Sequence, residues 1–182
     1  MRKENSIRKK IIGIICIMIV FVSIALGLIS YKAYYDAHIQ FYYDKALGIV
    51  KLLASEVDGE RIDYYVQTGD KDSEYIKMQE HFNNVKTNTS DLNYLYLFVP
   101  YEDYFIYAYT EWDDMNRISG LGDQFNYTET EYTYLIRDIE AKSASTRIVK
   151  GDDVGFGDYI AVWAPVIDEN GNVIAMVEAD YC

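Results

Sequence analysis

The sequence predicts an α+β fold in which a long N-terminal helix precedes an antiparallel sheet of about five strands. Two observations support this class. Residues 11–57 contain no proline and carry apolar side chains at helical spacing, whereas from residue 92 the apolar period changes to two, as in strands. The chain has 182 residues, half of them apolar, which suits one globular domain and excludes an entirely disordered chain.

Residues 11–30 form an uncharged and mostly aliphatic run. About 20 such residues, at 1.5 Å rise each, cross a hydrocarbon core of roughly 30 Å, which predicts a transmembrane helix at 11–31. The alternative is a cleaved signal peptide, whose apolar run would be shorter, at about 7–15 residues, and would end in a cleavage site of small residues. The uncleaved anchor fits this sequence better.

Charge is distributed unevenly around the predicted span. The net charge is −12 for the whole chain, and residues 1–10 carry five basic side chains against Glu4, a net of +4. With Lys32 also subtracted, residues 33–182 carry −17. The positive-inside rule therefore places residues 1–10 in the cytoplasm and 32–182 outside the cell, in contact with the lipid bilayer only through the anchor. A domain this acidic repels phosphate backbones, which excludes nucleic acid as an expected partner.

The helix is predicted to continue past the bilayer as a stalk over residues 33–57, because apolar residues up to Leu53 and Val57 keep the helical spacing. Two shorter helices are expected, at about 73–86 and 129–142.

The first predicted hairpin joins strands 92–99 and 104–110 through a turn at 100–103. With Val99 opposite Tyr104, one face is largely aliphatic. The other face carries only aromatic side chains: Tyr94, Tyr96, Phe98, Phe105, Tyr107 and Tyr109.

The second predicted hairpin joins strands 159–167 and 172–181, and a short strand near 146–149 precedes it. With Ile167 opposite Asn172, one face holds only small or aliphatic side chains, Val173 among them, and suits packing of the long helix. The other face carries Tyr159, Ala161, Trp163, Met176, Glu178 and Asp180.

The closing segment 159–180 resembles the last hairpin of the Cache superfamily, the PAS-like extracytoplasmic sensor domains of bacterial membrane receptors. The shared pattern is an aromatic strand, Pro165, the turn Asp168-Glu169-Asn170-Gly171, and an aliphatic strand that ends in Asp180. The earlier stretch 94–113 is similar to the same region of single-module Cache sensors. Such members usually have glycine where this chain has Ala175 or Glu178.

The resemblance implies a PAS-like sheet whose small-molecule pocket lies on the face away from the long helix, where the alternation places the aromatic side chains. Asp180 matches the terminal aspartate that holds the ligand amine in amino-acid-binding members. Arg117, in the loop after Trp112, could hold a carboxylate in fork geometry. The predicted ligand-binding residues are Tyr96, Tyr107, Tyr109, Trp112, Arg117, Tyr159, Trp163, Glu178 and Asp180.

Other interpretations of this face remain open. It could be a filled second core or bind a protein partner, Asp180 could cap a following helix, and Arg117 could be a solvated loop residue. The spacing of Glu178 and Asp180 is compatible with the carboxylate pair of a glycosidase, but adjacent acids are common on strands. No cofactor or metal site is predicted, although the acids at 152, 153 and 158 could gather a divalent cation.

The sequence therefore predicts the non-enzymatic, ligand-sensing domain of a receptor such as a diguanylate cyclase, histidine kinase or chemoreceptor, binding an amino acid or amine. The resemblance adds that such receptors commonly act as homodimers. A receptor needs a second span and an output domain after Asp180, so we expect this chain to be a fragment. The alternative is a membrane-anchored surface enzyme or binding protein without signalling output.

Overall fold

The computed structural model describes residues 2–110, 120–127, 129–149 and 159–181. The chain divides into two compact units, Met1–Phe41 and Tyr42–Cys182. Helix α1 (Arg2–Glu56) begins in the first unit and ends in the second.

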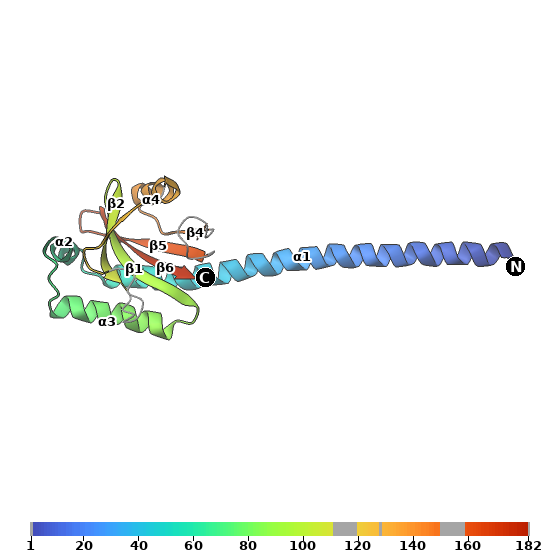
Figure 1. Cartoon of the computed structure of the whole chain (residues 1–182), viewed down its shortest axis with the longest axis horizontal. Coiled ribbons are helices and arrows are strands. Elements are labelled where there is room, and N and C mark those ends of the chain that lie inside the picture. Colours follow the sequence, from blue (N-terminus) through green and yellow to red (C-terminus); the bar gives the residue numbers. More distant parts are fainter. Residues whose placement is uncertain (1, 111–119, 128, 150–158, 182) are drawn as a thin grey trace. The chain divides into compact units, whose positions relative to one another are not determined.

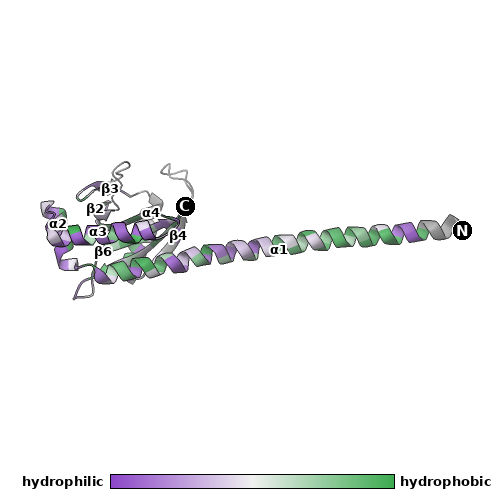
Figure 2. Ribbon diagram, turned by 90° about the horizontal axis from the view of Figure 1, so that it is seen from below, coloured by the Kyte–Doolittle hydropathy of each residue, from purple (hydrophilic) through white to green (hydrophobic). Residues whose placement is uncertain are grey.

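The first unit consists of the N-terminal part of α1, in which apolar residues predominate (Figure 2). By length and composition α1 could cross a membrane, and none of its most apolar window is buried against other described residues.

The second unit is built on one antiparallel sheet of six strands, in the order β3-β2-β1-β6-β5-β4. The predicted α+β class, with a long N-terminal helix followed by an antiparallel sheet, is confirmed. The additional strand, β3, has only three residues, all exposed, and lies at one edge. The strands are β1 (Leu92–Pro100), β2 (Tyr104–Thr110), β3 (Gln124–Asn126), β4 (Ser145–Val149), β5 (Tyr159–Ile167) and β6 (Val173–Tyr181).

Three shorter helices accompany the sheet: α2 (Gly59–Thr68), α3 (Ser73–Asn88) and α4 (Glu129–Ala141) (Figure 1). The carboxylates of Asp58 and Asp72 cap α2 and α3 by accepting hydrogen bonds from the N–H groups of Glu60, and of Glu74 and Tyr75. Helices α3 and α4 were expected from the amino-acid sequence, whereas no helix was expected at residues 59–68.

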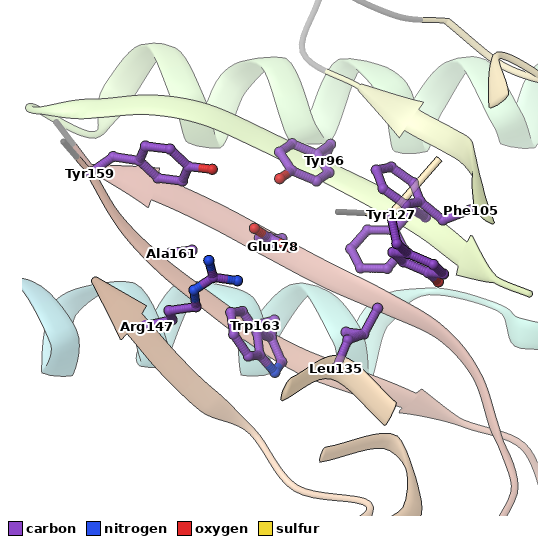
Figure 3. A pocket seen from close by; sticks show the side chains of 10 residues that line it. Tyr96, Phe105, Tyr127, Leu135, Arg147, Tyr159, Ala161, Trp163 and Glu178 are labelled. Atoms are coloured by element: carbon purple, nitrogen blue, oxygen red, sulfur yellow. The ribbon is translucent and has the colours of Figure 1, made fainter. Parts of the chain in front are cut away.

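The two faces of the sheet are covered by different helices. The last part of α1 and helix α3 lie behind the sheet in Figure 3, and Ala46, Val50 and Leu53 of α1 are completely buried. Along most of β5 and β6, the sheet face turned toward them carries small side chains, which allow a helix to approach closely. These buried small side chains are Val162, Ala164, Val166, Ala175, Val177 and Ala179, and the larger Ile160 and Tyr181 are buried at one end of the strand pair.

Both hairpins differ from the predicted register by two residues, which leaves the faces unchanged because side chains alternate with period two. Val99 is opposite Ile106 rather than Tyr104, and Trp163 is opposite Glu178 rather than Met176. The predicted assignment of most residues to the two faces therefore holds even though their partners differ.

A β-bulge in each hairpin does change the faces locally. On β2, Tyr107 is opposite Phe98 but Tyr109 is opposite Leu97, so Ala108 is the extra residue and Tyr109 changes face. The prediction that Tyr109 shares a face with Tyr107 is wrong. On β6 the bulge at Ile174 moves Val173 onto the aromatic face, where it packs against the buried cluster around Trp163.

Candidate functional site

The aromatic face of the sheet carries a second apolar cluster, covered by α4. Leu135 of α4 is buried in this cluster and Ile139 packs against it. The other buried members come from four strands: Phe98, Tyr107, Ala161, Trp163 and Met176. This face is thus partly filled, as the interpretation of a second core expected.

A cavity of about 50 Å³ remains within this cluster, inside a space of about 440 Å³ that is partly open to solvent (Figure 3). Its volume is smaller than the roughly 150 Å³ cavity that takes a benzene molecule in an engineered core. The side chains around it combine aromatic walls with two opposite charges, the composition expected of a small-molecule site. They are Tyr96, Phe98, Phe105, Tyr127, Leu135, Arg147, Tyr159, Ala161, Trp163 and Glu178.

The strand register explains why a cavity forms at this point. Ala161 of β5 lies between Arg147 of β4 and Asp180 of β6 in one cross-strand row. Its neighbours on the same face along β5 are Tyr159 and Trp163. A single methyl group surrounded by four large side chains leaves a depression, so Ala161 is the floor of the cavity.

The acidic side of the cavity is formed by β6. Glu178 lines the cavity, and Asp180, only 5% exposed, lies behind it and accepts a hydrogen bond from the Tyr96 hydroxyl, with 3.3 Å between the oxygens. Burial raises the pKa of Tyr96 well above its ordinary value, and the negative charges of Asp180 and Glu178 raise it further. Tyr96 therefore stays protonated and remains a hydrogen-bond donor at neutral pH.

The basic side is formed by Arg147, which the sequence analysis did not select. Its guanidinium carbon lies 5.3 Å from the centroid of the Tyr134 ring of α4, a cation–π contact. Figure 3 shows the guanidinium group extending over the cavity toward Glu178. Alternation along the predicted strand 146–149 assigns Arg147 to one face of that strand. Only the pairing of β4 with β5 shows that this face is the one with the cavity.

A buried carboxylate on α4 fixes the largest ring of the site. Asp138 is 3% exposed and accepts a hydrogen bond from the Trp163 indole N–H, at 3.1 Å. Arg137 contacts the other carboxylate oxygen through two nitrogens, each at 3.0 Å. The indole N–H is therefore engaged by α4, and Trp163 contributes an apolar surface to the cavity.

The structure brings together part of the predicted set. Tyr96, Tyr159, Trp163 and Glu178 line the cavity, whereas Asp180 and Tyr107 adjoin it as buried neighbours. Tyr109 lies on the opposite face, where its ring stacks on Tyr75 and Phe82 at centroid distances of 4.9 and 5.5 Å. Trp112 and Arg117, together with the acids at 152, 153 and 158, lie outside the described residues.

A larger hollow of about 600 Å³ lies between α1 and one end of β5, beside Leu47, Ala54 and Pro165. Its charged residues, Lys51 and Lys142, are exposed, so it lacks the buried, convergent polar groups of the aromatic cavity. Within the described ranges, no three His, Cys, Asp or Glu side chains are grouped closely enough to hold a metal ion.

No protein-family model matches the chain, and neither does any curated protein. Among solved structures, an IclR transcriptional regulator from Alicyclobacillus acidocaldarius is 17% identical, with a TM-score of 0.39 over 67% of this chain and 60% of that chain. A putative GAF sensor protein from Burkholderia vietnamiensis is 12% identical, with a TM-score of 0.39 over 71% of this chain and 72% of that chain. The inducer-binding domain of the PobR transcription factor from Acinetobacter, in complex with 3-hydroxybenzoic acid, is 13% identical, with a TM-score of 0.37 over 57% of this chain and 81% of that chain. These values are too low to assign the chain to a family.

Proposed function

We propose that this chain is the extracytoplasmic ligand-sensing domain of a bacterial transmembrane receptor, and that it binds an amino acid or an amine in the aromatic cavity. The observation that carries the proposal is the charged, aromatic cavity over Ala161, on the sheet face opposite the one covered by α1. A surface built only for stability would close this space, because interiors are packed at high density.

Helix α1 offers a route by which a bound ligand could act at a distance. Residues 46, 50 and 53 of α1 are buried on the sheet, and the same helix includes the apolar stretch that we propose crosses the membrane. A ligand that favours one packing of the sheet would shift the population of α1 positions, by no more than its difference in affinity for the two states.

The binding site can be tested by closing the cavity from its floor. The full chain in detergent micelles is screened by thermal shift against amino acids, amines and organic acids. A ligand at 100 times its Kd stabilises the folded state by about 2.7 kcal/mol and raises the melting temperature. In Ala161→Leu the added carbons occupy the cavity and should abolish this rise, whereas Ala161→Ser should retain it.

Two outcomes contradict the proposal. If no compound raises the melting temperature, the domain is not a sensor of these ligands. If the same compound stabilises Ala161→Leu as much as the wild type, the ligand binds elsewhere.

The proposed orientation in the membrane has its own test. Cys16 and Cys182 are replaced by serine, and a single cysteine is introduced either by Glu169→Cys, in the exposed turn between β5 and β6, or by Ser6→Cys. A membrane-impermeant maleimide should label the first variant in intact cells and the second only after lysis. The reverse pattern would contradict an extracytoplasmic sensor.

A further inference from the structure

We infer that the cavity recognises a small zwitterion, with Arg147 holding its anionic group and Glu178 its cationic group. This inference rests on the proposed function and refines it, because it excludes simple amines as preferred ligands. It also gives the anion-binding role to Arg147 rather than to Arg117.

The strand pairing sets the two charges on opposite sides of the cavity. Arg147 belongs to β4 and Glu178 to β6, and β5 with Ala161 and Trp163 runs between them. Because neighbouring strands lie about 4.8 Å apart, the backbones that carry the two charges are roughly 10 Å apart. Both side chains reach inward over Ala161 (Figure 3), so their charged groups approach the cavity from either side.

The pairing of charges decides which ligand class is favoured. Arg147 and Glu178 carry opposite charges and both line the cavity. A simple amine beside Glu178 would place a second cation near Arg147, and a simple carboxylate beside Arg147 would place a second anion near Glu178. A zwitterion offers an opposite charge to each of the two side chains. A singly charged analogue pairs with only one of them and places a like charge near the other.

The volume of the cavity and the side chains that form its walls restrict the class of ligand further. The cavity of about 50 Å³ admits a ligand core smaller than a benzene ring. The Tyr96 hydroxyl and the Trp163 N–H are directed at Asp180 and Asp138, so these rings chiefly offer apolar surface. A planar guanidinium can bind both oxygens of a carboxylate, which lysine cannot do.

The test compares glycine, methylamine and acetate as probes, with binding to the full chain in detergent measured by calorimetry. Wild-type protein should bind glycine at least about tenfold more tightly than either singly charged probe, because each probe lacks one of the two hydrogen-bonded charged groups. A tenfold difference corresponds to about 1.4 kcal/mol. Arg147→Met should lose this preference over methylamine, and Glu178→Gln should lose the preference over acetate. Arg147→Lys should fall between wild type and Arg147→Met.

Lys77→Met is the matched control, because it also removes one positive charge but lies on α3, where Lys77 is paired with Glu74. Circular dichroism of each variant checks that it is folded. The inference is overturned if methylamine binds wild type as tightly as glycine, or if glycine binds Arg147→Met unchanged. If one of these two results is obtained but Ala161→Leu still abolishes ligand binding, the cavity remains the binding site and the proposed function stands. Should no compound of the wider panel bind at all, both fail.

Discussion

Asp138 is the residue on which the geometry of the cavity depends most directly. Its side chain is almost fully buried on α4, where it contacts Trp163 and Arg137. A buried carboxylate is tolerated only where its hydrogen bonds are satisfied. Its role in this structure is to fix the plane of the indole ring that forms one wall of the site.

Replacement of Asp138 by alanine should therefore destabilise the domain by about 1–3 kcal/mol, the cost of leaving a buried donor without its acceptor. Urea unfolding, followed by circular dichroism, measures this difference. Because Trp163→Phe removes the donor itself, the double variant should lose less stability than the sum of the two single variants. Strict additivity of the two effects would show that the hydrogen bond contributes nothing.

Sequence alone identified part of this site because alternation assigns faces without requiring the correct partner. Trp163 and Glu178 were placed together by parity, although their predicted register was two residues off. Arg147 was missed for a physical reason: its position depends on the pairing of β4 with β5, in which Arg147 lies opposite a residue 14 positions later in the sequence. The significance of Ala161 also appears only once its larger neighbours are known.

At the scale of elements, the β-bulges within the two hairpins change which residues the helices contact. The bulge at Ala108 turns Tyr109 toward α3, where it joins Tyr75 and Phe82. Here Tyr75 donates its hydroxyl hydrogen to the carbonyl oxygen of Ala108, at 3.0 Å. A bulge inserts one residue without a clear signal in the amino-acid composition. The period-two pattern therefore predicted both hairpins but not the change of sheet face at each bulge.

The bulge on β6 places Ile174 against the start of α2. A Cβ atom added at Gly59 would collide there with the Ile174 Cδ1 atom. In Gly59→Ala the flexible end of Ile174 must turn away, so the variant should gain less stability than its helix propensity alone would give. Gly48 of α1 has open space around it, so Gly48→Ala should stabilise the protein by about 0.5–1 kcal/mol through helix propensity.

Chemical denaturation of both variants measures the difference between the two positions. Ile174→Val removes the colliding atom, so in that background Gly59→Ala should stabilise the protein more than it does in the wild type. If Gly59→Ala stabilises the wild type as much as Gly48→Ala does, Ile174 does not pack against α2 as described.

At the scale of the whole molecule, buried tyrosine side chains occur on both faces of the sheet. The chain contains 19 tyrosines, and several are buried among other rings. Burial raises the pKa of Tyr65 to about 12 and that of Tyr181 to about 12, and it also raises the pKa values of Tyr96 and Tyr109. These four residues belong to α2, β6, β1 and β2, so their ionisation reports on the complete fold.

The direction of these shifts predicts alkaline unfolding. A group whose pKa is raised on folding binds its proton more tightly in the folded state, so its stabilising contribution is complete below the unfolded pKa of about 10. That contribution is lost as the pH rises through the folded value. The free energy of unfolding should therefore decrease between about pH 10 and pH 12.

Absorbance at 295 nm, which follows tyrosine ionisation, should show two phases in the native protein and one phase near pH 10 in urea. The late phase should coincide with loss of the circular dichroism signal, because the buried rings ionise when the sheet and helices separate. Tyr109→Phe keeps the stacked ring but removes one buried hydroxyl, so the late amplitude should fall by one tyrosine. A single phase near pH 10 in the folded protein would mean that these rings are accessible to water, and the two-faced packing of the sheet could not then be as described.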